Sequence, residues 1–198
     1  AVSYVEWAGS AFQDTVIGWT LIDGEASARA FAGKLAALPP GRGPYTSLSR
    51  AIDFALPLFN GNGFESPRRV IDISGDGPNN SGRLVTAARD EAVAANVTIN
   101  GLPIVNDRPG PSGRPTMPNL DLYYRKCVIG GPRSFIVVAN DFKSFARAIR
   151  RKLILEIAGR SPADAAAPFG KRSIPVARGR TAPPCDIGER RRRERFGY

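Results

Sequence analysis

A strand, a helix and a second strand in direct succession constrain the fold of this chain more than any other sequence feature. Residues 69–74 form a short apolar run typical of a buried strand, which stops at Gly75-Asp76-Gly77-Pro78-Asn79-Asn80, and these six residues can only be a loop. A helical pattern follows, with Ser81 as its expected N-cap, and leads to a strand at residues 97–105. Strands connected in this way run parallel in one sheet. The sequence therefore predicts an α/β fold.

Strand-like and helical segments continue on both sides of this unit. Residues 2–7 and 16–22 are expected to form an antiparallel pair at a sheet edge, because they are close in sequence and joined through Gly9-Ser10. The helix after Ser81 is expected to bury Leu84, Ala87, Ala88 and Ala92. The other expected elements are helices at residues 28–38, 48–59 (kinked or shortened by Pro57), 119–124 (capped by Asn119) and from 141 onward, and a strand at 135–139. The pattern predicts an open, mostly parallel sheet with helices on both faces.

The composition excludes several functional classes. The chain has 198 residues and no histidine, which excludes Ser-His-Asp and Cys-His catalysis and removes the commonest transition-metal ligand. Cys127 and Cys185 lie far apart, so the sequence predicts no zinc knuckle, no Cys-x-x-Cys pair and no disulfide framework, and it gives no indication of compartment. No apolar run of about 18 residues is present, so no transmembrane segment is expected.

The composition changes at Gly159, where Pro, Ala, Gly and Arg begin to dominate. We therefore expect residues 1–158 to form one domain and residues 159–198 to be a disordered tail. The tail carries roughly +6 of the net charge of +10 and contains four consecutive arginines, Arg190 to Arg193. Such a block can bind nucleic acid or anionic lipid, but aromatic residues are not interleaved with it. We interpret it as a solvated tail without specific nucleic-acid binding.

Two strand-to-helix loops hold the best candidates for a binding site. In an open parallel sheet, ligands bind at the carboxyl ends of the strands, and the loops at residues 43–49 and 74–80 are expected there. Thr46 and Asp76 offer a hydroxyl and a carboxylate, which are hard oxygen donors of the kind that Mg²⁺ or Mn²⁺ accepts. The alternative interpretation makes Thr46 a helix N-cap and Asp76-Gly77 an ordinary turn. Asp72, inside its strand, is interpreted as structural, at a contact between helix and sheet.

Several separated motifs resemble von Willebrand factor type A (vWA) domains. Thr46-Ser47-Leu48 followed by Ala51-Ile52 looks like their Thr-x-Leu-x-x-Ala-Leu segment, and Ile71-Asp72-Ile73-Ser74-Gly75-Asp76-Gly77 looks like their strand ending in Thr-Asp-Gly. Their spacing and order also match. The runs at residues 70–80, 99–104 and 128–132 are similar to a bacterial branch of this superfamily whose role is unassigned. The resemblance covers residues 1 to about 158.

This resemblance implies a non-enzymatic protein-binding or adhesion-type module with a metal-ion-dependent adhesion site (MIDAS), to which Thr46 and Asp76 contribute. The family's Asp-x-Ser-x-Ser sequence occurs nowhere in the chain. It is expected on a first strand before Ala1, in the middle of the sheet between the strands at Val2 and Val70, and its loss should leave a gap or exposed strand edges. Mg²⁺ or Mn²⁺ binding by this chain alone is therefore expected to be weak or absent. The family also implies a protein partner and an exported or periplasmic location in a bacterium.

Two alternatives from other classes remain open. The Gly75 to Asn80 loop also resembles the Gly-Asp-Gly-x-x-Asp loop of haloacid dehalogenase-like phosphohydrolases, which holds Mg²⁺. That family needs an Asp-x-Asp nucleophile motif, which this chain lacks, and Asn80 stands where its second loop acid belongs. Nucleic-acid binding through the basic tail is the other alternative. The phosphohydrolase alternative does not explain the spacing of Thr46, Leu48 and Ala51. No catalytic residue and no enzymatic activity are predicted.

Overall fold

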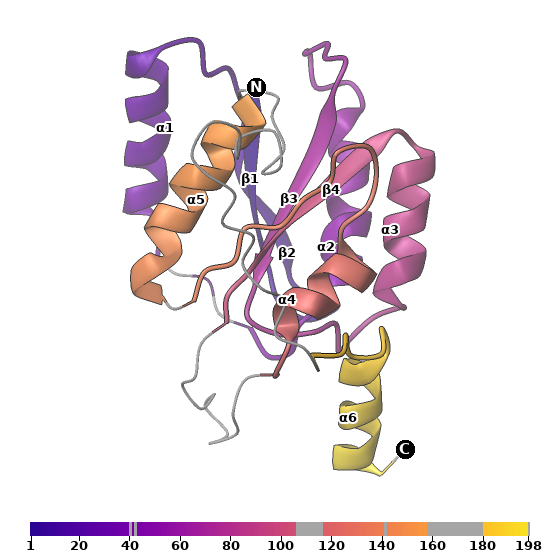
Figure 1. Ribbon diagram of the computed structural model, residues 1–198. Coiled ribbons are helices and arrows are strands. Elements are labelled where there is room, and N and C mark those ends of the chain that lie inside the picture. Colours follow the sequence, from indigo (N-terminus) through magenta and orange to yellow (C-terminus); the bar gives the residue numbers. More distant parts are fainter. Residues whose placement is uncertain (40, 42, 106–116, 141, 158–179, 198) are drawn as a thin grey trace, which may run out of the picture.

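Two pairs of strands form the centre of the computed structural model, which describes residues 1–39, 41, 43–105, 117–140, 142–157 and 180–197. β1 (Val2–Trp7) and β2 (Gln13–Thr20) pair antiparallel, and β3 (Arg69–Gly75) and β4 (Val97–Pro103) pair parallel, with Arg69 opposite Val97. Both pairings confirm the predictions made from the sequence. Figure 1 shows the two pairs side by side in the middle of the molecule.

The segment predicted as a strand at residues 135–139 runs parallel to β4 but forms only isolated bridges. Gly101 pairs with Ile136 and Ile104 with Ala139, both in the parallel sense. The first half of this edge of β4 is taken by Gly130, which pairs antiparallel with Ile99. The predicted parallel direction of this segment is confirmed. A regular set of strand hydrogen bonds with β4 does not form, because the turn at Gly130 occupies part of the same edge of β4.

Within the described residues, no backbone hydrogen bond connects β1 or β2 to β3 or β4. The side chain of Trp7 at the end of β1 reaches the core beside Gly75 at the end of β3, so the two pairs meet through packing rather than through a ladder. The strand expected between those at Val2 and Val70, and the gap that its absence would leave, remain predictions.

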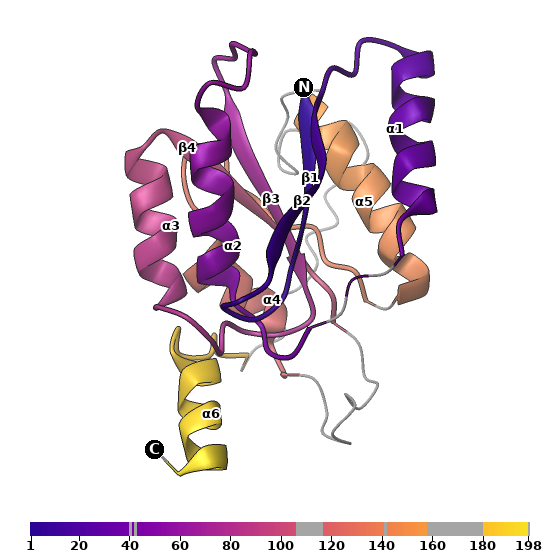
Figure 2. The ribbon, with the colours of Figure 1, turned by 180° about the vertical axis from the view of Figure 1, so that it is seen from behind.

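Helices cover both faces of the strands. α2 (Leu48–Ala55) and α3 (Val85–Ala94) pack on one face, and α5 (Phe142–Ile157) lies across the other (Figures 1 and 2). The remaining helical elements are α1 (Glu25–Ala37), η1 (Leu56–Phe59), α4 (Leu120–Tyr123), η2 (Tyr124–Val128) and α6 (Ile187–Phe196). The α-helix α2 ends at Ala55 and the 3₁₀ turn η1, which contains Pro57, begins at Leu56, so the helix is shortened as the sequence predicts. None of the described helices is long and apolar enough to cross a membrane.

The helix predicted to begin after Ser81 begins later, at Val85, so the prediction of Ser81 as its N-cap is wrong. Ser81 is buried, and its carbonyl oxygen accepts a hydrogen bond from Ser47 Oγ at 2.7 Å. These groups connect two loops instead of capping a helix. The inward face is formed by Val85, Ala88 and Ala92, whereas Leu84 and Ala87, which were predicted to be buried, are exposed. Asn119 does precede α4, but its side chain does not cap that helix.

Asp72 lies at a contact between helix and sheet, as interpreted from the sequence. Its carboxylate forms an ion pair with Lys152 on α5, whose ammonium group also lies 3.6 Å from Glu156. Lys152 is only 3% exposed, and this burial lowers its pKa to about 8 while Glu156 acts in the opposite direction. Glu156 also accepts a hydrogen bond from Asn100 on β4. This network fixes the position of α5 against β3 and β4.

The prediction of a disordered tail is wrong for residues 180–197, while residues 158–179 lie outside the described part of the chain. Cys185 forms a disulfide with Cys127 in η2, which contradicts the expectation of no disulfide. Arg180 forms an ion pair with Asp121. α6 begins after Asp186, which pairs with Arg190, and ends at Gly197 in the left-handed conformation. This helix has no apolar stripe, so the apolar pattern of the sequence did not reveal it. The domain boundary at residue 158 remains a prediction.

Candidate functional site

The two loops predicted to meet do meet, at the carboxyl end of β3. Thr46 and Asn80 form a reciprocal pair: Thr46 N–H donates to Asn80 Oδ1 at 2.8 Å, and Asn80 N–H donates to the Thr46 carbonyl at 2.9 Å. Ser49 N–H donates to Asn79 Oδ1 at 3.0 Å. These three bonds hold the segment before α2 against the segment after β3. The loops lie at the end of the molecule that also carries α6 (Figure 1).

Thr46 does not cap α2, because Ser47 is the N-cap residue and its Oγ accepts a hydrogen bond from Arg50 N–H. The Thr46 side chain is half-buried, and its hydroxyl lies beside the turn that follows Asp76: a Cβ atom at Gly77 would be 3.4 Å from Thr46 Oγ1. Asp76 is exposed, and its carboxylate has no hydrogen bond or ion pair with the described residues. The Thr46 hydroxyl is therefore next to the Asp76-Gly77 turn, and the Asp76 carboxylate is open to ligands.

The donors present suit a hard divalent cation only in part. Thr46 and Asp76 supply one neutral and one anionic oxygen, which fit a Mg²⁺ or Mn²⁺ ion that keeps most of its water. The described residues contain no group of three or more His, Cys, Asp or Glu side chains able to hold a metal ion. With a single carboxylate ligand, a divalent cation gains little binding free energy relative to its full hydration in bulk water.

Asn79, whose loop the sequence places at the site, makes contacts that the sequence did not predict. It is completely buried, and besides accepting from Ser49 N–H it donates through Nδ2 to the Arg83 carbonyl at 2.9 Å and to Glu189 Oε1 at 2.6 Å. Its backbone N–H donates to the hydroxyl of Tyr123. Asparagines after a Gly-Pro turn are ordinary turn residues, so only their distant partners reveal this role.

α6 packs directly on the loop that follows β3. Gly188 is buried, and a Cβ atom there would overlap the carbonyl oxygen of Asn79, so no other residue type fits without displacement of the helix. Glu189, the next residue along α6, accepts the hydrogen bond from Asn79. Burial raises the pKa of the Glu189 carboxyl group, while the hydrogen bond from Asn79 opposes that rise. Arg192 Nη1 donates to the carbonyl oxygen of Asn80 at 3.1 Å. The C-terminal helix is therefore part of the surface around the candidate metal loops.

Tyr123 and Tyr124 lie beneath these loops. Both are completely buried, and burial raises the pKa of both phenols above their ordinary value. The Tyr123 hydroxyl donates to the carbonyl oxygen of Cys185 at 3.3 Å. The Tyr124 hydroxyl lies beside Gly75 and has no hydrogen-bond partner among the described residues. This aromatic pair supports the end of β3 from below.

The parallel pair of strands with helices on both faces, and the two joined loops at their carboxyl end, belong to a von Willebrand factor type A-like fold. The chain belongs to the DUF1194 family of proteins of unknown function, whose family model matches residues 1–161. No curated protein matches the sequence.

Solved structures with a similar fold include proximal thread matrix protein 1 from the mussel byssus. One structure of that protein has a TM-score of 0.54 at 12% sequence identity, and the similarity covers 79% of this chain and 36% of the mussel protein. Another, with a zinc-occupied MIDAS motif, has a TM-score of 0.52 at 14% identity and covers 78% and 34% of the two chains. The chain thus spans about a third of the length of the mussel protein, and the similarity concerns the fold alone.

Proposed function

We propose that this chain is a non-enzymatic protein-interaction module that binds its partner at the edge formed by residues 46–49 and 76–81. The observation that carries the proposal is the joining of the two loops by Asn79 and Asn80. This joining places the Thr46 hydroxyl beside the turn at Gly77 and leaves Asp76 exposed. Such an edge is rigid and polar, and it resembles the ligand-binding edge of other open parallel sheets.

Thr46 and Asp76 are the residues of this edge that hold a hydrated Mg²⁺ or Mn²⁺ ion. The ion supplies positive charge to which an acidic or carbonyl oxygen of a partner is attracted. Because only one ligand is anionic, binding by this chain is weak. The disulfide between Cys127 and Cys185 supports an exported or periplasmic location, since disulfides persist in oxidising compartments.

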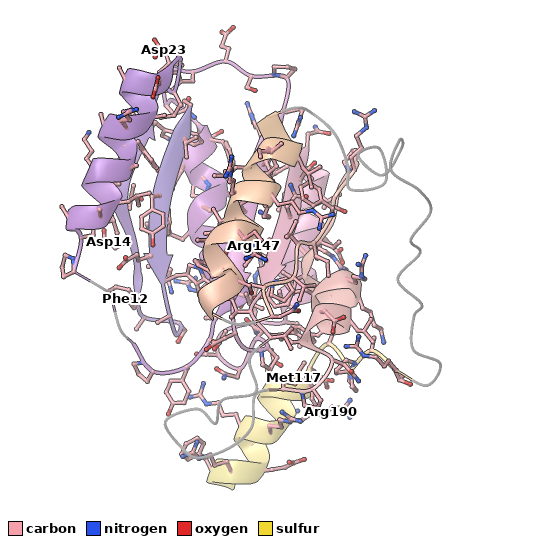
Figure 3. All side chains as sticks on the ribbon, turned by 60° about the vertical axis from the view of Figure 1, so that its left-hand side comes forward. Phe12, Asp14, Asp23, Met117, Arg147 and Arg190 are labelled. Carbon is pink, nitrogen blue, oxygen red and sulfur yellow. A yellow bond between two sulfur atoms is a disulfide. The ribbon has the colours of Figure 1, made fainter. Side chains whose placement is uncertain are left out.

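A photo-crosslinking experiment tests where a protein partner binds. p-Benzoylphenylalanine at Tyr45, which is 45% exposed and precedes Thr46, is expected to give a protein adduct in the native host. The same group at Leu21, 52% exposed and close in sequence to Asp23 at the far end of the molecule from α6 (Figure 3), is expected to give none. Asp76→Asn should abolish the adduct at position 45. Equal adducts from both positions would show that the loop edge is not the binding surface.

Metal binding is tested by Mn²⁺ titration of the whole chain, followed through water-proton relaxation. The chain is expected to bind Mn²⁺ with a dissociation constant on the order of a millimolar or weaker, because most of the hydration shell is retained. Asp76→Asn should remove this binding, whereas Asp23→Asn, with the same charge change at the opposite end (Figure 3), should not. If Asp76→Asn binds Mn²⁺ as well as the unaltered chain, the metal is not held by Asp76.

A further inference from the structure

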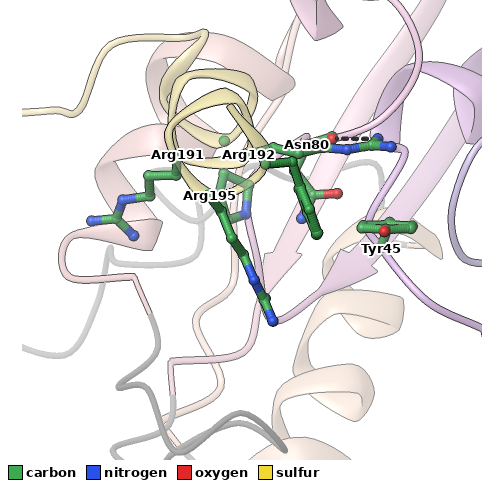
Figure 4. A pocket seen from close by; sticks show the side chains of 8 residues that line it. Tyr45, Asn80, Arg191, Arg192 and Arg195 are labelled. Carbon is green, nitrogen blue, oxygen red and sulfur yellow. Dashed lines mark hydrogen bonds between the residues drawn. The ribbon is translucent and has the colours of Figure 1, made fainter. Parts of the chain in front are cut away.

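A small pocket lies between α6 and the two loops (Figure 4). Tyr45, Pro78 and Asn80 line it from the loop side, and three arginines, Arg191, Arg192 and Arg195, line it from α6. Its volume is about 140 Å³, enough for a small polar group or a single side chain. None of its described lining residues is acidic, so the pocket is strongly positive.

Arg192 is held in place within this pocket. Its Nη1 donates to the Asn80 carbonyl, and its guanidinium lies over the Tyr45 ring, 4.3 Å from the centroid. Its Nε is buried and has no acceptor among the described residues, so the hydrogen bond of Nη1 and the contact with Tyr45 are the contacts from this part of the chain that hold the guanidinium. Tyr45 has a positive φ of 69°, an unfavourable conformation for a bulky residue, and it keeps the aromatic ring under Arg192.

Within the described part of the chain, no ion pair neutralises the arginines of the pocket. Arg190, on another side of α6, pairs with Asp186, but Arg191, Arg192 and Arg195 form no ion pair with any described residue. Arg191 and Arg195 are four residues apart on one helix face, where like charges destabilise the helix. A bound anion would remove this repulsion.

We propose that this pocket binds one carboxylate from an acidic segment of a protein partner. The planar guanidinium groups match a carboxylate in shape and can donate two parallel hydrogen bonds. The pocket adjoins Tyr45 and Asn80, next to the edge proposed to bind protein, so a partner seated on that edge can place an acidic side chain in it. The choice of a protein as the source of the carboxylate rests on the proposed function.

The test uses the full chain, a fluorescent hexaglutamate peptide, and anisotropy in a buffer containing a metal chelator. The double variant Arg191→Gln/Arg195→Gln is expected to weaken peptide binding by roughly tenfold, because it removes two charged donors from the pocket. The matched variant Arg190→Gln/Arg193→Gln removes the same charge from the same helix outside the pocket. It should weaken binding by less than about twofold. Hexaglutamine should not bind.

Equal weakening by the two double variants would overturn the proposal, because the attraction would then come from the whole basic helix. Binding of inorganic phosphate as tight as that of hexaglutamate would also overturn it, since the pocket would then be a site for a free oxyanion. Tighter binding of an oligothymidine with the same dependence on Arg191 and Arg195 would reassign the pocket to nucleic acid. Since the chelator removes Mn²⁺ and Asp76 is unchanged, failure here is distinct from failure of the metal-dependent edge.

Discussion

Replacing both Cys127 and Cys185 by alanine is expected to lower the free energy of unfolding by about 4 kcal/mol and to release α6 from the loops. The disulfide links positions separated by 58 residues, and closing a loop of this length restricts the unfolded chain by about that amount. α6 has only ten residues, and helices this short are marginal in water unless they are held by other contacts. Urea denaturation measures the loss of stability.

Limited trypsin digestion of the same variant reports on α6, because the helix is rich in arginine and is cut readily once it is detached. The unaltered chain treated with a reductant should behave like the alanine variant, which separates loss of the bond from any effect of the new side chains. If α6 stays as protected in both reduced forms as in the oxidised chain, its polar contacts alone hold it, and the disulfide has no part in docking the helix.

Asn79→Ala is expected to lower the free energy of unfolding by roughly 3 kcal/mol. The change leaves Ser49 N–H, the Arg83 carbonyl and Glu189 without their present partner, and Asn79 itself is completely buried. Buried polar groups that lose a partner contribute most of the loss, because water reaches them poorly. Thermal and urea denaturation measure the effect.

Asn80→Ala is the matched control for this prediction. The Asn80 side chain accepts one hydrogen bond, from Thr46 N–H, and the residue is only half-buried, so its loss should be about 1 kcal/mol. Equal losses in the two variants would mean that Asn79 does not join the loops to α6 in the way its contacts indicate.

The parts of the fold that depend on local sequence could be predicted. The apolar run before Gly75, the helical spacing after it and the close pair of strands at the N-terminal end each carry their own signal. The start of α3 was predicted three or four residues too early because Ser81 is a good N-cap by type, whereas its groups are used by Ser10 and Ser47. Local pattern alone does not show such competition from distant partners.

The candidate site could be predicted to the level of its loops. Topology places Thr46 and Asp76 at the same edge of the sheet, and the loops that carry them do meet there. The hydrogen bond between Asn79 and Glu189 could not be predicted, because a polar residue gives no sign of a partner 110 positions away. The docking of α6 was missed for a related reason: the helix is held by a disulfide, a close backbone contact at Gly188 and polar groups.

The bond between Cys127 and Cys185 also turns the stretch of chain between them into a covalently closed ring. A single backbone cut anywhere inside that ring opens it without dividing the molecule, so α6 stays linked to the domain through sulfur. Such a nicked chain keeps its full mass in electrophoresis without reductant and falls into two fragments when reductant is added. A cut between the cysteines therefore separates the arginine-rich helix covalently from the rest of the domain only after the disulfide is also reduced.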